Sequence, residues 1–149
     1  MAERTLFPCR IVTPEGVAFE GGARMLIVSG TGGEAGFLAQ HAPLVAELRM
    51  GSTRVQMEDD SWSEWATGPG FAQVHDSTGN VLVDDAIAVE AIDVAAVTGE
   101  IERAKADLDR VGSDSDDPVF KADSKAAQRA IAWGEHLLAT AERAAGAAH

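Results

Sequence analysis

The chain has 149 residues, is 46% hydrophobic and carries a formal net charge of −12, which supports one moderate core with a small appendage and excludes a disordered tail. The charge argues against a nucleic-acid backbone or an anionic lipid surface as a direct partner, because each would repel the protein. Any membrane association should run through another protein, since no segment approaches the roughly twenty apolar residues that cross a bilayer and the N-terminus lacks a signal-peptide pattern.

The chain up to about Val89 consists of short β-like runs separated by Gly, Pro, Asn and Asp, a pattern typical of a sandwich or a barrel. Turns are expected at residues 58–60 and 76–80, so hairpins and sequential antiparallel pairing should dominate. The ten predicted strands are residues 5–13, 17–20, 24–29, 36–39, 44–50, 52–57, 61–67, 70–75, 80–84 and 86–89.

Four glycines, a histidine and a proline crowd the stretch from Gly30 to Leu44. A phosphate-binding P-loop needs Lys-Ser or Lys-Thr after its last glycine, followed by a helix. Here Phe37 and Leu38 follow Gly36, and Pro43 comes soon after. The stretch therefore predicts a tight excursion between two strands that glycine makes accessible.

After Asp93 the apolar residues recur in alternating steps of three and four, which predicts a helix that ends near Val111. Asp93 is well placed to cap this helix. The run Gly112–Pro118 holds only breakers, turn formers and acidic residues, and predicts an exposed linker. The predicted apolar stripe consists of Val94, Val97, Ile101, Ala104, Leu108 and Val111.

A second, alanine-rich helix is expected from about Ser124. Two helices with one narrow apolar stripe each, joined by a short polar loop, should form an antiparallel hairpin that leans on the sandwich or on another protein. The second stripe consists of Ala127, Ile131, Gly134, Leu138, Ala141 and Ala145.

The four histidines, at positions 41, 75, 136 and 149, lack the spacing of a metal site. His41 lies in the glycine-rich stretch, where a hydrogen bond that fixes the loop is favoured over catalysis because no nucleophile accompanies it. Cys9 is alone, so it can form no internal disulfide and is expected to be a packed side chain in a reducing compartment. No metal or cofactor is expected.

Two acidic clusters resemble functional sites only in part. Residues 114–117 resemble the start of a calcium loop, but Val119 and Lys125 stand where that loop needs its glycine and its closing glutamate. Asp84 and Asp85 cannot act together as acid and base within a strand, because adjacent strand residues point to opposite faces. The residues therefore favour a protein that works by contact.

Four segments carry a family resemblance. Residues 30–44 are similar to the pattern Gly-x-x-Gly-x-x-Gly-x-x-x-x-His-Ala-Pro-Leu, and "RMGSTRV", "GFAQV" and "VLVDDA" are similar to later strands and turns of the same family. With the helical hairpin after Asp93, the chain resembles the epsilon subunit of the F-type ATP synthase, called delta in mitochondria.

The resemblance implies a ten-stranded β-sandwich over residues 1–91 and a helical hairpin over residues 92–149, with an acidic linker at 112–118. It implies a non-catalytic subunit of the central stalk, without cofactor, peripheral at the cytoplasmic face of a bacterial inner membrane. Its partners would be the gamma subunit, on the side of the sandwich, and the membrane c-ring. The implied ring-contact loop comprises Gly30, Thr31, Gly32, Gly33, Glu34, His41, Ala42 and Pro43.

In some members of this family the hairpin inhibits ATP hydrolysis, and in some it binds ATP. Contacts with the alpha and beta subunits would use Lys121, Lys125, Arg129 and Arg143. The ATP-binding pattern retains Asp93, but Ala96 replaces the arginine and removes a bidentate phosphate donor, so ATP binding is not expected.

Two alternatives from other classes remain. The first is a free-standing acidic β-sandwich that serves as an adaptor or a ligand-binding module, which would form a stable monomer without affinity for gamma. The second is a small hydrolase that uses His41 or His75.

Overall fold

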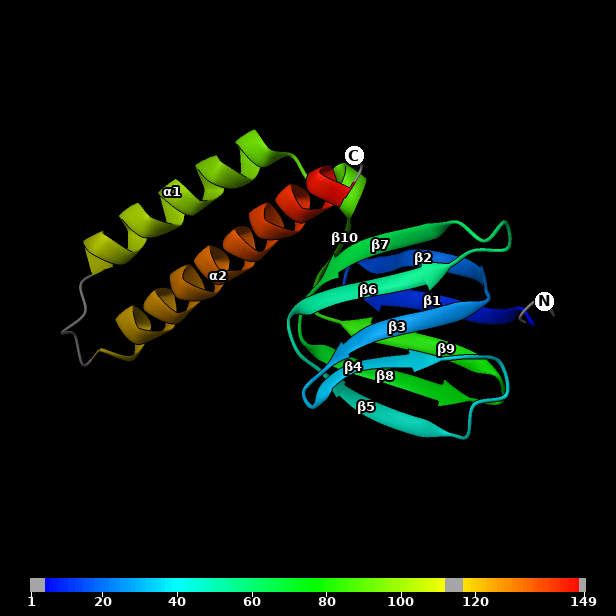
Figure 1. The fold of residues 1–149 in the computed structure, drawn as a ribbon. Helices are drawn as coiled ribbons and strands as arrows, with labels where there is room; N and C mark the ends of the chain where they lie inside the picture. Colours follow the sequence, from blue (N-terminus) through cyan, green and yellow to red (C-terminus); the bar gives the residue numbers. More distant parts are fainter. Residues whose placement is uncertain (1–4, 112–116, 148–149) are drawn as a thin grey trace. The chain divides into compact units, whose positions relative to one another are not determined.

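The computed structural model describes residues 5–111 and 117–147, and the chain divides after Val89 into two compact units (Figure 1). The first unit is the predicted ten-stranded β-sandwich, and each predicted strand overlaps an observed one. The strands are β1 (Phe7–Thr13), β2 (Gly16–Ala23), β3 (Met25–Gly30), β4 (Gly33–Phe37), β5 (Leu44–Leu48), β6 (Gly51–Gln56), β7 (Trp62–Thr67), β8 (Gly70–His75), β9 (Thr78–Val83) and β10 (Ala86–Ala88).

Alternating side chains fill the core of the sandwich. Along β1, for example, Phe7, Cys9 and Ile11 are buried while the residues between them are exposed, the period expected of a strand with one buried face. Burial raises the pKa of the Cys9 thiol to about 12, so it stays protonated. The largest side chains that are fully buried include Phe37, Leu26, Val28, Val55 and Val81.

The expected dominance of sequential pairing is wrong. The strands run in the order β10-β7-β6-β3-β5-β8-β9-β1-β2, with β4 attached to β3. Among the described strands, four of the nine pairs join consecutive strands, and β1 pairs in parallel with β9. The path curls so that Phe19 of β2 meets Trp65 of β7, with ring centroids 5.0 Å apart. Burying one face of every strand requires these long-range pairs, which local patterns do not encode.

The turn predicted at residues 76–80 is shorter than expected. Asp76 and Ser77 alone connect β8 to β9, and both have positive φ, 51° and 58°. Gly79 belongs to β9 instead and is buried, since a β-carbon there would lie 3.2 Å from Leu26 and 3.3 Å from Phe7. This glycine therefore serves the core and not the turn.

The second unit is the predicted antiparallel helical hairpin. A 3₁₀ turn, η1 (Val89–Ala91), spans the boundary between the units, and the helices are α1 (Val94–Val111) and α2 (Pro118–Ala147). α2 begins six residues earlier than predicted, because Asp117 caps it by accepting a hydrogen bond from Val119 N at 2.9 Å and proline fits a first helical turn. The predicted linker thus ends before Pro118, and its residues 112–116 lie outside the described residues.

The two helices approach closely at a glycine. A β-carbon on Gly134 would lie 2.5 Å from Cγ1 of Ile101 and 3.6 Å from Cγ1 of Val97. Val97, Ile101 and Ala104 are buried as their stripe predicts, whereas Val94 is 53% exposed. Leu137 and Thr140 are also buried, although they lie outside the predicted stripe of α2. Neither helix, within the described residues, is long and apolar enough to cross a membrane.

Candidate interaction surfaces

The first half of the glycine-rich stretch is the tip of the β3–β4 hairpin. Gly30 pairs with Gly33, a β-carbon on Gly30 would lie 2.9 Å from the Gly33 carbonyl oxygen, and Gly33 has a φ of 127° that favours glycine. The backbone N–H of Thr31 donates to the carbonyl of Glu47 on β5 at 3.0 Å. The tip is therefore a compact turn anchored to a neighbouring strand.

Glu34, the first charged side chain after this tip, reaches across the outer face of β3. Its carboxylate forms an ion pair with Arg54 on β6, and the Arg54 guanidinium lies 5.9 Å from the centre of the Trp62 ring on β7. Glu34 remains 61% exposed at its side chain. The ion pair with Arg54 thus positions the Glu34 carboxylate, and a partner can still contact it.

His41 lies in the loop after β4 and is fixed by local contacts. Its Nδ1 is 2.8 Å from the Ala42 carbonyl oxygen, and its ring stands edge-on to Phe37 with centroids 5.0 Å apart. His41, Ala42 and Pro43 are exposed. The predicted hydrogen bond that fixes the loop is present.

The structure separates the two halves of the predicted ring-contact loop. Residues 30–34 lie at one end of β4, whereas residues 41–43 follow its other end, and a five-residue strand spans roughly 17 Å. Figure 1 shows the β3–β4 turn and the β4–β5 loop at opposite ends of the sandwich. One flat partner surface at the tip would not reach His41.

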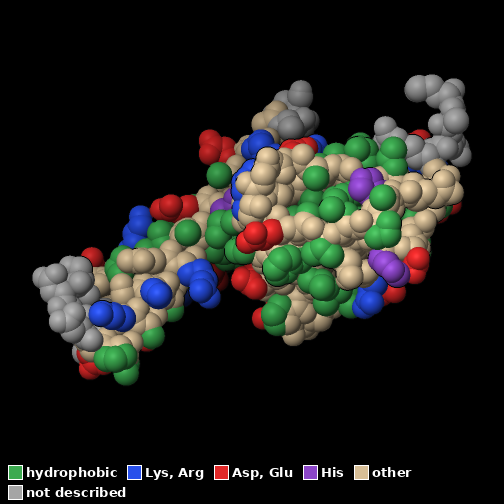
Figure 2. Space-filling model, turned by 90° about the horizontal axis from the view of Figure 1, so that it is seen from below, with side chains coloured by type: hydrophobic (Ala, Val, Ile, Leu, Met, Phe, Trp, Pro, Cys, Tyr) green, Lys and Arg blue, Asp and Glu red, His purple; other side chains and the backbone are tan. Residues whose placement is uncertain are grey.

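Outward-facing apolar side chains form a surface on β5, β8 and β9. Val45 is 61% exposed, Phe71 52% and Leu82 45%, and Phe71 pairs directly with Leu82. Figure 2 looks from below onto the side of the sandwich that carries β5, and shows hydrophobic side chains gathered there. Sequence reasoning missed this surface, although Phe71 and Leu82 hold outward positions beside the buried Ala72 and Val81.

The cationic residues predicted on the hairpin share one side of α2. At 3.6 residues per turn, they fall within a sector of roughly 80°. The buried Ala127 and Gly134 face the opposite side of the helix, so this stripe points away from α1. It consists of Lys121, Lys125, Arg129 and Arg143.

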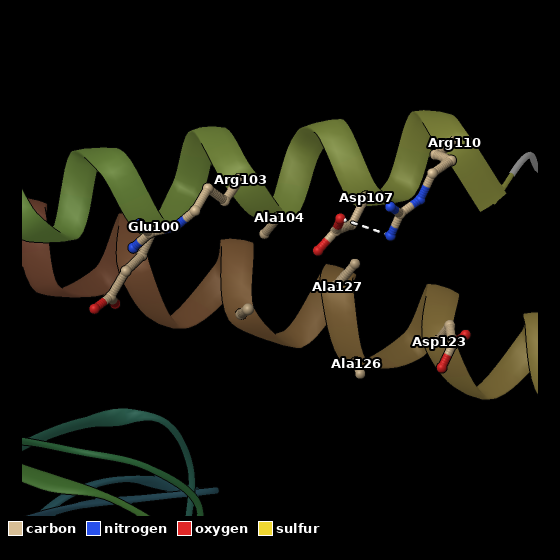
Figure 3. A pocket seen from close by; sticks show the side chains of 9 residues that line it. Glu100, Arg103, Ala104, Asp107, Arg110, Asp123, Ala126 and Ala127 are labelled. Atoms are coloured by element: carbon tan, nitrogen blue, oxygen red, sulfur yellow. Dashed lines mark hydrogen bonds and ion pairs between the residues drawn. The ribbon is translucent and has the colours of Figure 1, made fainter.

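An open groove of about 610 Å³ runs between α1 and α2 (Figure 3). Alanines of both helices form its floor, and Arg110 donates to Asp107 Oδ1 at 2.9 Å on its rim. Asp93 lies outside this lining and accepts a hydrogen bond from Ala96 N at 3.1 Å, as the predicted cap of α1. The charged residues of the lining are Glu100, Arg103, Asp107, Arg110 and Asp123.

The other predicted polar positions have structural roles. Asp84 N donates to the Pro69 carbonyl and Gly68 N to the Asp85 carbonyl, so the backbone of these aspartates ties the β9–β10 connection to the β7–β8 connection. His75 pairs with its neighbour Asp76, Nδ1 to Oδ2, at 2.9 Å. In the part of the chain that the structure describes, His, Cys, Asp and Glu form no group that could hold a metal.

Residues 6–89 match the family described as ATP synthase, Delta/Epsilon chain, beta-sandwich domain. An ATP synthase epsilon chain of Desulforudis audaxviator is 43% identical over 105 residues, which cover 70% of this chain and 75% of the relative. One from Rubrobacter xylanophilus is 29% identical over 143 residues, 96% of each chain.

The fold is similar to a chain of the Euglena gracilis mitochondrial ATP synthase, in a structure of OSCP, F1 and the c-ring. The TM-score is 0.66 at 21% identity, and the match covers 93% of this chain and 82% of that one. These matches define a class, the small sandwich-and-hairpin chains of ATP synthases. The chain belongs to the delta/epsilon chain family of ATP synthase.

Proposed function

We propose that this chain is a non-catalytic epsilon-type subunit of the central stalk of an F-type ATP synthase, at the cytoplasmic face of a bacterial inner membrane. The family match supports this role. So do its similarity to named epsilon chains and its likeness in fold to a chain of the Tetrahymena thermophila mitochondrial "central stalk/cring", with a TM-score of 0.54 at 13% identity, covering 90% of this chain and 97% of that one.

The proposal that the sandwich binds the gamma subunit rests on the apolar surface of Val45, Phe71 and Leu82. A rotor must transmit torque without slipping, which demands an extensive interface with an apolar centre. These side chains are 45–61% exposed in the isolated chain, so an apolar partner would remove substantial area from water. Gamma is the partner of this surface.

The c-ring contact is assigned to the tip of the β3–β4 hairpin, residues 30–34. The anchored turn gives a rigid point of contact, and Glu34 offers a polar group to the ring. His41, Ala42 and Pro43 lie at the other end of β4, so we assign them to a different surface of the stalk.

Copurification with the gamma subunit and the c-ring from the same organism tests both contacts. Phe71→Glu should weaken gamma binding at least tenfold, because it places a charge at the centre of the interface. Trp62→Glu, on the opposite layer, is the matched control and should bind gamma normally. Glu34→Lys should lose the ring and retain gamma. No complex with gamma under any condition would favour the free-standing adaptor.

The hairpin is proposed to regulate ATP hydrolysis through the cationic stripe on α2, which would contact acidic surfaces of the alpha and beta subunits. The stripe points away from α1, and Lys125 and Arg129 within it are exposed. In the reconstituted enzyme, the double variant Lys125→Glu/Arg129→Glu should raise ATP hydrolysis. Lys105→Glu on α1 is the control with a charge reversal outside the stripe, and an equal rise in both would contradict the assignment.

ATP itself is not proposed as a ligand of the hairpin. Asp93 is engaged as a helix cap, and the groove between the helices carries three carboxylates beside its two arginines, which disfavour a polyphosphate. Titration calorimetry of the full chain should show no saturable ATP binding. Tight saturable binding would overturn this part of the proposal.

A further inference from the structure

The outer edge of β2 is open. Among the described strands, β2 pairs with β1 alone and ends the path of the sheet. The other end of the strand path is β10, which pairs only with Trp65–Thr67 of β7. Among the described strands, none therefore pairs with β2 on the side away from β1, at Gly22. An exposed row of backbone groups of this kind is a template for strand addition.

The register indicates which backbone groups of β2 face outward. Residues of an antiparallel pair alternate between pairs that exchange two hydrogen bonds and pairs that exchange none. Pro8 has no N–H, so the pair Pro8–Gly22 cannot exchange two bonds. Arg24 N, two residues after Gly22, donates to the Gln56 carbonyl of β6, away from β1. Glu20 and Gly22 thus present their N–H and C=O groups to the open edge.

Two grooves flank this edge and meet at Gly22. One, of about 360 Å³, is mostly apolar and is lined by Leu6, Phe7 and Pro8. The other, of about 550 Å³, is lined by Met57, Glu58 and Asp59. A strand added here would direct alternate side chains toward an apolar groove and an acidic one.

The acidic groove is held in shape by a buried arginine. Arg24 donates from Nε and Nη2 to the Glu58 carbonyl at 2.9 and 2.8 Å, and its Nε lies 3.2 Å from Asp60. Ser61 donates two hydrogen bonds to Asp59 Oδ1, one from its backbone N–H at 3.0 Å and one from its hydroxyl, and these hold the pKa of Asp59 below its usual range. The backbone of Glu58 and the carboxylate of Asp59 are therefore held in place beside the open edge.

We propose that the edge of β2 at Glu20 and Gly22 receives an extended segment of a partner protein in which lysine or arginine alternates with an aliphatic residue. Backbone pairing would supply affinity, and the two grooves would supply specificity. A second copy of this chain is disfavoured, because each copy carries a net charge of −12. This edge lies outside the gamma surface and the hairpin tip, and the inference does not rest on the proposed function.

Amide hydrogen exchange of the full chain with the peptide acetyl-Val-Lys-Val-Lys-Val-amide tests the inference. The peptide should slow exchange of the Glu20 and Gly22 amides by roughly tenfold near saturation, because both amides gain acceptors. The Gly21 amide, which faces β1, should change little. A peptide with glutamate in place of lysine and one with alternate amides methylated should give no protection.

A pair of charge reversals supplies the control within the protein. Glu58→Lys keeps the backbone carbonyl that Arg24 binds and should weaken the peptide at least about fivefold at low salt. Glu47→Lys, on β5, should leave peptide binding unchanged. Absent protection at millimolar peptide, equal protection by the glutamate peptide, or protection that rises with protein concentration alone would each overturn the inference.

Discussion

Two glycines in the β3–β4 tip are required for different reasons, and a third is not. Gly30 lacks room for a β-carbon, Gly33 has a positive φ, and Gly32 has open space and no such φ. Gly30→Ala and Gly33→Ala should each lower the free energy of unfolding by about 1–3 kcal/mol. Gly32→Ala, the matched control, should be close to neutral. Urea unfolding measures all three, and an equal loss in the three variants would contradict this account.

The turn at Asp76 and Ser77 has a poorly suited residue, Ser77, at its second position. Both have positive φ, as in a type I′ hairpin turn, where glycine is preferred at the second position. Ser77→Gly should therefore raise the free energy of unfolding by about 0.5–1 kcal/mol. The adjacent Thr78→Gly, inside β9, should lower it. Thermal unfolding of the two variants checks the opposite signs.

Glycines on the two helices should likewise respond in opposite directions. A β-carbon added to Gly99 on α1 would have nothing within 4 Å, whereas one on Gly134 would collide with Ile101. Gly99→Ala should stabilise the hairpin by about 1 kcal/mol through helix propensity. Gly134→Ala should destabilise it by forcing the helices apart. Helical circular dichroism during heating tests both, and a stabilising Gly134→Ala would refute the close contact.

At the scale of elements, the sequence predicted the strands better than their partners. Alternation along β1 and β8 is a local signal, so their existence was visible. The pairing of β5 with β8 joins segments far apart in the chain and depends on the whole core. The start of α2 was missed, although Asp117 followed by Pro118 is a recognisable cap and first turn.

The candidate surfaces were predictable to different extents. The cationic residues of α2 and the glycine-rich tip stand out in the sequence, through their spacing and composition. The exposed surface of Val45, Phe71 and Leu82 does not, because exposure depends on which strand covers which face. The open edge of β2 is equally invisible, since it follows from the order of the strands.

At the scale of the molecule, the raised pKa of Asp85 makes stability depend on pH. Burial, then the charges of Glu15 and Asp84, raises the pKa of Asp85 above its ordinary 3.8. Folding therefore disfavours the ionised carboxylate. This penalty is absent below the unfolded pKa, where both states are protonated, and develops as the pH rises through the folded pKa.

Asp85→Asn removes that penalty. The variant should have a higher free energy of unfolding than the parent chain at pH 7, and the gain should vanish near about pH 3. Urea unfolding at the two pH values measures the difference, and an equal gain at both would show that packing and not charge is responsible.

The parallel pairing of β1 with β9 places a condition on how the chain is made. Cys9 pairs with Gly79, so the first strand to leave the ribosome waits for about seventy more residues before its second neighbour exists. Until then β1 has only β2 beside it, and the other edge of β1 is open. A nascent chain should therefore gain resistance to proteases abruptly, once β9 has emerged, and not strand by strand.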